Sequence, residues 1–334
     1  MEVSPDAIAR LSRSALEAGI TWDNHGCMPL EATGRCLEQL ERYRRAGFNV
    51  VSINISYADM QWTDGLPVLS YMRSWIARHP EEYGLISTVD DIARCKADHK
   101  LGVVFDIESM FPVLDHPPLV QTFYELGVRW MLITYNRNNR AGGGCLDNDG
   151  GLTPLGRTII DEMARVGMVL CLSHTGHRTV LEAIEYSSNP VIFSHSNPYG
   201  DTAHPRNIPD ALIQACARTG GVVGISGFGP FLGAQSNLVD RLLVQLRYVM
   251  NLVGPDHVGL GLDYVFDRSE LDEAVKRNPG LFPVGFDRPE DLQMVAPESL
   301  PLIAEALVRE GLSEGQIRNV LGENWLRIAQ RVWR

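Results

Sequence analysis

The sequence has no uninterrupted apolar stretch of about 18 residues, the length from which a membrane-spanning helix is inferred. Its first segment, MEVSPDAIARLSRSALEAG, also lacks the continuous apolar core of a signal peptide. Basic residues are outnumbered, with 30 Lys and Arg against 41 Asp and Glu, and no basic run is long enough to follow a phosphate backbone. We therefore expect a cytoplasmic protein with neither a membrane span nor a nucleic-acid partner.

Paired cysteines and internal linkers are also lacking. Six cysteines are scattered along the chain without a C-x-x-C pair, so we expect free thiols, several of them small core residues. No low-complexity tract divides the sequence, and 45% hydrophobic with 21% charged residues is typical of a globular protein. We predict one domain over residues 1–334, since a barrel of alternating strands and helices commonly takes about 250 residues or more.

A short apolar run followed by a longer amphipathic segment recurs along the chain, as in strand–helix units around a parallel sheet. Several runs are almost continuously apolar, as expected for parallel strands that are buried on both faces. Eight strands close a (β/α)8 TIM barrel, and we predict this fold, of the metal-dependent hydrolase type, with covering helices in the last two segments. The predicted strands are 20–24, 49–55, 101–107, 128–134, 168–172, 191–194, 221–225 and 258–262, and the covering segments are 299–311 and 313–332.

Two segments interrupt this pattern. Residues 136–154 are rich in glycines and amides, and residues 266–299 are rich in Pro, Asp and Glu. Loops of this length in a compact domain are often functional, and for 266–299 a binding lid and a mobile surface insertion both stay open. The glycines at 142–144 lack the spacing of a phosphate-binding loop, and we interpret them as a source of flexibility.

Side chains of the metal-binding kind follow several predicted strands. His174 and His195 each end an apolar run, and Glu108 and Asp263 follow two others. The carboxyl ends of barrel strands meet at one face, so we expect these side chains to converge there. Any one of them alone could be structural, for example a helix N-cap at Asp263. Their repetition on separate units indicates a metalloenzyme.

The spacing of these residues suits two ions. His25 and Cys27, at positions i and i+2, point to the same side of the first strand and can bind one ion together. His174 and His195 end consecutive strands, about 5 Å apart, and can share a second ion. Glu108 is the candidate to bridge ions that lie about 3.5–4 Å apart.

The ligand types point to zinc. Imidazole, carboxylate and thiolate all bind this metal, so we predict two Zn²⁺ ions. The first site depends on Cys27. Its thiolate can serve as a ligand, or a neutral buried thiol can leave that site weak or empty, and both alternatives stay open.

Several motifs resemble those of the membrane (renal) dipeptidase family of zinc peptidases. The densest block runs from CLSHTG through VIFSHSNPYGDTAHPRN to GGVVGIS, within residues 171–226. Further similarities are DNHGCMPL at 23–30, ELGVRWMLITYN at 125–136, GLTPLGR at 151–157, VGLGLDY at 258–264 and QIRNVLGENWLRI at 316–328. The resemblance extends over nearly the whole chain. It implies a binuclear zinc site in which His25 binds the first ion, Glu108 bridges, and His174 and His195 bind the second.

The resemblance also implies how a substrate is held and cleaved. Arg206, in HPRN, would bind the carboxylate of the C-terminal residue in the bidentate manner of a guanidinium. Asp263 would take a proton from, or orient, the metal-bound water and deliver a proton to the leaving amine. The implied reaction is hydrolysis, by a metal-bound hydroxide, of dipeptides, including those with a C-terminal D-residue. The family often forms dimers, so a homodimer is implied, although no apolar stripe marks an interface.

Two positions depart from the family pattern. Cys27 stands where the family has the second ligand of its H-x-D pair, and Tyr135 stands where the family has a histidine. A tyrosine hydroxyl can donate the same hydrogen bond to a developing oxyanion. We therefore predict a zinc dipeptidase with Asp263, Glu108 and Tyr135 in catalysis. The departures favour, as the alternative, a related amidohydrolase of another small amide or ester; a non-catalytic metal- or ligand-binding protein is the third interpretation.

Overall fold

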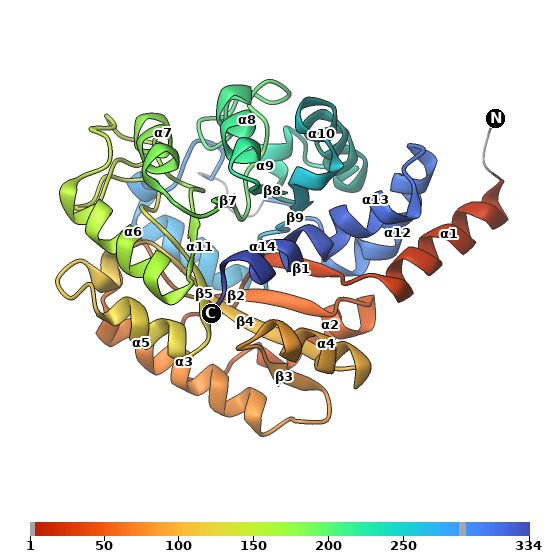
Figure 1. The fold of residues 1–334 in the computed structure, drawn as a ribbon, viewed down its shortest axis with the longest axis horizontal. Coiled ribbons are helices and arrows are strands. Elements are labelled where there is room, and N and C mark those ends of the chain that lie inside the picture. Colours follow the sequence, from red (N-terminus) through yellow and green to blue (C-terminus); the bar gives the residue numbers. More distant parts are fainter. Residues whose placement is uncertain (1–3, 287–291) are drawn as a thin grey trace.

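The computed structural model describes residues 4–286 and 292–334. Within these ranges eight parallel strands form a closed ring, because the last one, β9, pairs back to the first between Leu260 and Asp23 (Figure 1). Each strand overlaps one of the eight predicted runs, and the (β/α)8 prediction is confirmed. In ring order they are β1 (Trp22–Cys27), β2 (Val50–Tyr57), β4 (Leu101–Glu108), β5 (Val128–Leu132), β6 (Val169–Cys171), β7 (Ile192–Phe193), β8 (Val222–Ile225) and β9 (Val258–Leu260).

Two short strands outside the ring were not predicted. β3 (Tyr83–Leu85) adds to the beginning of β4. β10 (Tyr264–Val265) follows β9 after a break and pairs with β1 at Gly26 and Cys27. The chain on both sides of Asp263 is therefore anchored to the first strand of the barrel.

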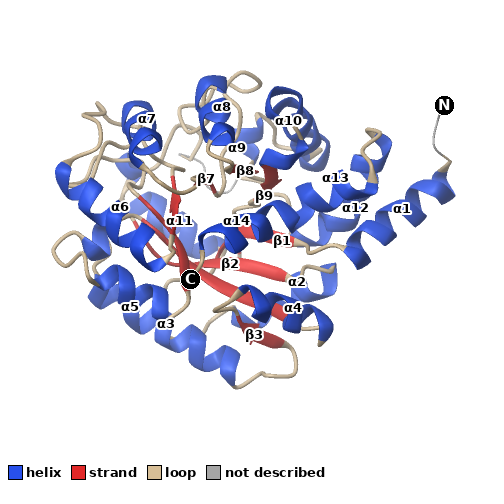
Figure 2. Cartoon of the chain, viewed as in Figure 1, coloured by secondary structure: helices blue, strands red, loops and turns tan. Residues whose placement is uncertain are grey.

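Helices surround the ring of strands (Figure 2). Five glycines that follow helices have positive φ, a conformation that glycine adopts without steric cost: Gly47, Gly127, Gly167, Gly220 and Gly254. The helices before the C-terminal region are α1 (Pro5–Ala18), α2 (Leu40–Ala46), α3 (Trp62–Ala77), α4 (Val89–Ala97), α5 (Leu119–Glu125), α6 (Pro154–Val166), α7 (His177–Tyr186), α8 (Asp210–Arg218), α9 (Gly229–Leu232), α10 (Leu238–Val253) and α11 (Arg268–Arg277). None of the helices in the described ranges is long and apolar enough to cross a membrane.

The predicted covering helices are α12 (Leu300–Arg309), α13 (Glu314–Arg318) and α14 (Asn324–Val332), and the last of these packs against the barrel core. Trp325 of α14 donates from its indole to the carbonyl of Leu260, at 3.1 Å. The Trp325 ring can pack against the strands because two strand residues are glycines. A Cβ at Gly259 would lie 2.6 Å from the ring, and a Cβ at Gly224 would lie 3.0 Å from it. Together with Trp22 and other residues that begin strands, Trp325 forms a buried cluster of its own. One end of the barrel is thereby filled, which leaves the carboxyl ends of the strands for a site.

The cysteines agree with the prediction. All six are free thiols, and Cys95, Cys171 and Cys216 are buried.

Candidate metal centre and active site

The carboxyl ends of the strands bring the predicted ligands to one point. Oε1 of Glu108, the last residue of β4, lies 3.3 Å from Nε2 of His25, 3.5 Å from Nε2 of His174 and 3.3 Å from Nε2 of His195. The Nε2 atoms of His174 and His195 are 2.8 Å apart. Oε1 is buried and, among the described residues, has no hydrogen-bond partner of good geometry. The lone pairs of this carboxylate oxygen and of the three histidine nitrogens converge on one buried point, an arrangement that suits a bound cation.

Cys27 and Asp263 extend this cluster on the side of β1. Sγ of Cys27 lies 3.4 Å from Nε2 of His25 and 3.5 Å from Oδ1 of Asp263. Oδ1 of Asp263 is 3.7 Å from Nε2 of His25. His25 therefore belongs to two overlapping three-ligand groups, one with Glu108 and His195 and one with Cys27 and Asp263. The i, i+2 spacing does place both side chains of β1 on one side.

A second set of side chains, which the sequence analysis missed, orients the histidines. Each ring has a polar partner at Nδ1, which turns Nε2 toward the centre and, where the partner accepts the Nδ1 proton, leaves Nε2 free to bind a metal. The pairs are His25 with Asp106 (3.4 Å), His174 with Asn136 (2.8 Å) and His195 with Ser194 (2.8 Å). Asp106 could have been found, because it is a charged residue in an apolar run, two positions before Glu108 and so on the same side of the strand.

We expect Asp106→Asn to weaken metal binding about 10- to 100-fold, because it removes the carboxylate that orients His25. Competition with a chromogenic chelator would measure the affinity. Asp161→Asn, which changes an aspartate that accepts from Tyr186 on the surface, is the matched control and should bind metal like the parent protein. An unchanged affinity in Asp106→Asn would show that Asp106 does not support the metal centre.

The electrostatics of the centre favour a positive charge near His25. Burial alone lowers the pKa of His25, but the nearby carboxylates of Glu108 and Asp106 raise it well above its usual value. His174 and His195 behave in the opposite way, since burial and neighbouring positive groups hold their pKa values well below the usual range. These two imidazoles are therefore neutral, as metal ligands must be. At His25 a proton and a metal ion compete for the same nitrogen.

Burial also shifts the acids of the centre. It raises the pKa of Asp263 to about 6, and the nearby Glu108 carboxylate acts in the same direction. It raises the pKa of the Cys27 thiol as well, so the sulfur keeps its proton until a cation displaces it. A carboxyl group with a pKa close to neutrality can both accept and release a proton.

Three residues around the centre have left-handed backbone although they carry side chains. Their φ angles are 59° at Asn136, 61° at His174 and 60° at Asp263. Such conformations cost of order 1–3 kcal/mol each and persist where the surrounding structure enforces them. At Asp263 the backbone amide donates to the carbonyl of His25, at 2.9 Å, which fixes the carboxylate over the centre.

Arg206 brings a buried positive charge next to the metal centre. The residue is 2% exposed. Nη2 donates to the carbonyl of His195 at 2.9 Å, Nη1 donates to Oγ of Ser196 at 3.3 Å, and Nε lies 3.1 Å from Nδ1 of His174. These three partners are uncharged. The guanidinium charge is thus available to an anionic ligand in the cavity that it lines.

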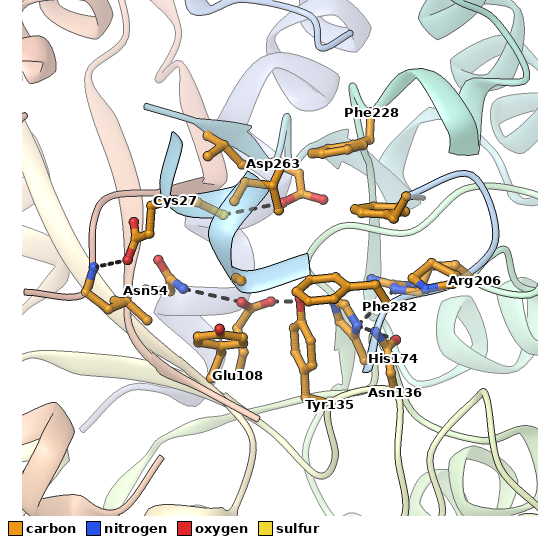
Figure 3. A pocket seen from close by; sticks show the side chains of 18 of the residues that line it. Cys27, Asn54, Glu108, Tyr135, Asn136, His174, Arg206, Phe228, Asp263 and Phe282 are labelled. Atoms are coloured by element: carbon orange, nitrogen blue, oxygen red, sulfur yellow. Dashed lines mark hydrogen bonds and ion pairs between the residues drawn. The ribbon is translucent and has the colours of Figure 1, made fainter. Parts of the chain in front are cut away.

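Tyr135 also lies where the sequence placed it, beside the ligands (Figure 3). Its ring stacks on that of His174 with centroids 4.2 Å apart, and Tyr57 meets it edge-on at 5.2 Å. Burial holds the pKa of Tyr135 well above its usual value. The hydroxyl therefore keeps its proton and can donate a hydrogen bond.

The centre opens into a cavity of about 750 Å³, counted with its open mouth. One side is lined by an aromatic wall, which consists of Phe228, Phe231, Phe282 and Phe286. The last two come from the 266–299 segment, so its described part forms a boundary of the cavity. Two side chains that follow β5 anchor this segment. Nδ2 of Asn136 donates to the carbonyl of Leu281 at 3.0 Å, and Arg137 donates to the carbonyl of Gly280.

The interpretation of glycines 142–144 as a flexible stretch was wrong. All three are buried. A Cβ at Gly143 would lie 2.0 Å from Oδ1 of Asp149, and one at Gly144 would lie 2.3 Å from the carbonyl oxygen of Asn136. These glycines allow close packing beneath the residue that orients His174, and flexibility is not their role.

Comparison with known proteins agrees with the resemblance. The sequence profile of the membrane dipeptidase family (peptidase family M19) matches residues 32–282, about three quarters of the chain. Dipeptidase verJ of Clonostachys rogersoniana is 27% identical over 270 residues, which cover 79% of this chain and 64% of that protein. Dipeptidase tcpJ of Claviceps purpurea is 26% identical over 292 residues, which cover 86% and 63%. The chain thus spans slightly less than two thirds of the length of these curated relatives.

Solved structures share the fold. An amidohydrolase from Pseudomonas aeruginosa superposes with a TM-score of 0.87 at 28% identity, over 96% of this chain and 99% of that chain. A metallopeptidase from Rhodobacter sphaeroides, liganded with a phosphinate mimic of the dipeptide L-Ala-D-Ala, has a TM-score of 0.77 at 21% identity, over 94% and 100%. A closed barrel that gathers histidines and carboxylates at its strand ends defines the class of metal-dependent barrel proteins. Within that class, the chain belongs to the membrane dipeptidase family, peptidase family M19.

Proposed function

We propose that this protein is a zinc dipeptidase, with residues 1–334 as one catalytic domain, that hydrolyses the amide bond of dipeptides, including those with a C-terminal D-residue. The observation that carries the proposal is the convergence of three histidine Nε2 atoms on Oε1 of Glu108, with the buried guanidinium of Arg206 beside them. This combination suits a metal centre next to a carboxylate-binding group. Family membership and the dipeptide mimic bound by the Rhodobacter sphaeroides protein add support.

The ligand set fits two Zn²⁺ ions. We assign His25, Cys27 and Glu108 to the first ion, and Glu108, His174 and His195 to the second. The Glu108 oxygen, which is buried and has no hydrogen-bond partner in the described part of the chain, and the facing imidazole nitrogens support this assignment. When bound, the metal supplies a Lewis acid that activates water and polarises the substrate carbonyl.

Three further side chains would act on the substrate. Arg206 binds the carboxylate of the C-terminal residue through two parallel hydrogen bonds. Asp263 accepts a proton from the attacking water and returns it to the leaving nitrogen, a role that suits its pKa of about 6. The hydroxyl of Tyr135 donates to the carbonyl oxygen as negative charge develops there.

Cys27 and Tyr135 favour one alternative, a related amidohydrolase that acts on another small amide or ester. Both residues contact the centre, and both differ from the family pattern. A non-catalytic metal-binding protein is the remaining interpretation. The cytoplasmic location and the homodimer stay predictions from the sequence.

We expect zinc-reconstituted protein to release amino acids from a panel of L-L and L-D dipeptides, and we expect a chelator to abolish that release. Quantification of free amino acids with time measures it, and re-addition of zinc after chelation controls for damage to the protein. Turnover of other amides or esters without dipeptide cleavage would support the alternative. No turnover of any of these compounds by folded protein of verified metal content would contradict the proposed function.

A further inference from the structure

One charged side chain in the cavity has no part in the proposed mechanism. Among the described residues, four charged side chains line the cavity: Glu108, Arg206, Asp263 and Glu270. Glu108 and Asp263 belong to the metal centre, and Arg206 is assigned to the substrate carboxylate. Glu270, in the first turn of α11, is left without a function.

Among the described residues, the groups around Glu270 compensate its charge only in part. Its Oε1 accepts a hydrogen bond from the backbone amide of Leu30 at 3.0 Å, which fixes the side chain but supplies no positive charge. Arg35 is the neighbouring cation, and it is already paired with Glu31 and Asp267. Burial raises the pKa of Glu270, and the nearby charge of Arg35 lowers it by less.

Glu270 and Arg206 lie at opposite sides of the barrel mouth. Glu270 is held by Leu30, three residues after β1, whereas Arg206 contacts His174, three residues after β6. In the closed ring of eight strands, β6 is four strands from β1 in either direction, so the two strands face each other across the barrel. The metal centre lies between them. The cavity therefore presents a negative group, the metal ligands and a positive group in this order.

A dipeptide carries complementary groups in the same order: an α-ammonium, the scissile amide and a carboxylate. We propose that Glu270 is a specificity residue that pairs with the α-ammonium of the substrate, so that the protein prefers zwitterionic dipeptides to N-acyl amino acids. This inference rests on the proposed function and refines its substrate class. An ammonium on a substrate side chain has the same chemistry, and the experiment separates the two sources.

The test compares the dipeptide that the protein cleaves fastest with its N-acetyl derivative, in the parent protein and in Glu270→Gln. The Gln oxygen can still accept from the Leu30 amide, so the variant removes the charge and keeps the local structure. We expect the parent protein to prefer the free amine by about tenfold or more in kcat/KM, mostly through KM, as for loss of a charged hydrogen bond. Glu270→Gln should lose this preference and cleave the N-acetyl compound at the parental rate. Glu273→Gln, an exposed glutamate of the same helix, should keep the preference.

A binding measurement makes the test independent of turnover. Calorimetric titration of Asp263→Asn protein, with and without Glu270→Gln, with the same two compounds gives the ratio of their Kd values. For a protein that cleaves nothing, L-Ala-D-Ala and its N-acetyl derivative serve as the pair. A preference for binding the free amine that requires Glu270 supports the inference even if no dipeptide is cleaved. The lack of cleavage would then contradict the proposed function but not the role of Glu270.

Two outcomes would overturn the inference. One is equal affinity of the parental site for the free and N-acetylated compounds. The other is a Glu270-dependent preference that appears only with an N-acetyl-lysyl compound, because Glu270 would then recognise a side-chain ammonium. Parental thermal stability of Glu270→Gln verifies that any loss is not caused by unfolding.

Discussion

Asp263→Asn is expected to lower kcat by about 10²- to 10⁴-fold, the usual contribution of a general acid–base group, while the metal stays bound. Asparagine has nearly the shape of aspartate and keeps an oxygen near Cys27 and His25, but its amide cannot accept a proton. The backbone bond from residue 263 to the carbonyl of His25 does not depend on the side chain. Steady-state kinetics with the best dipeptide, together with elemental analysis of the same sample, would measure both properties.

The control for this variant is Asp240→Asn, an exposed aspartate in the first turn of α10, which should leave kcat unchanged. Parental rates in Asp263→Asn would remove Asp263 from the mechanism. If the variant loses an ion as well as activity, Asp263 is a metal ligand. The elemental analysis tests this outcome because Oδ1 of Asp263 lies only 3.7 Å from Nε2 of His25, a proposed metal-binding nitrogen.

Glu108→Gln is expected to have the largest effect on the metal centre. A neutral amide removes the negative charge around which all three histidine Nε2 atoms lie, at 3.3 to 3.5 Å. We expect at least one ion per chain to be lost, and kcat/KM to fall by about 10³-fold or more, since the Lewis acid contributes several kcal/mol to stabilisation of the transition state. Elemental analysis and kinetics would record the two effects.

Thermal unfolding provides an independent test of whether Glu108→Gln still binds metal. A metal that binds only the folded state raises Tm, so zinc should stabilise the parent protein and have little effect on the variant. In the metal-free state the variant should be no more stable than the parent, because it removes the charge that faces protonated His25. Full zinc content and an undiminished zinc-dependent rise in Tm would contradict the bridging role of Glu108.

The sequence predicted the ring of strands and the residues at their ends because both depend on local pattern. His174 and His195 follow apolar runs that are too short to be buried helices, and Glu108 ends another such run. The partners of the histidines were missed for a physical reason. Ser194 and Asn136 are common polar residues, and only the folded chain shows that their oxygens reach imidazole nitrogens.

Residues far apart in the sequence were the least predictable. Glu270 lies in a segment that interrupts the strand–helix pattern, and its place in the cavity depends on contact with Leu30, 240 positions earlier. Glycines 142–144 were misjudged because the same residue type serves mobile turns and close packing. The difference lies in what a Cβ would touch, and at Gly143 that neighbour is Asp149.

The side chain of Asn136 couples the substrate range of this protein to its metal chemistry, which matters for any redesign. Its oxygen accepts from Nδ1 of His174, while its nitrogen donates to the carbonyl of Leu281 at the edge of the aromatic wall. Exchange of the 278–286 loop for that of a relative would therefore alter the orientation of a metal ligand as well as the shape of the cavity. A graft intended to change selectivity alone must keep a backbone carbonyl at the position of Leu281.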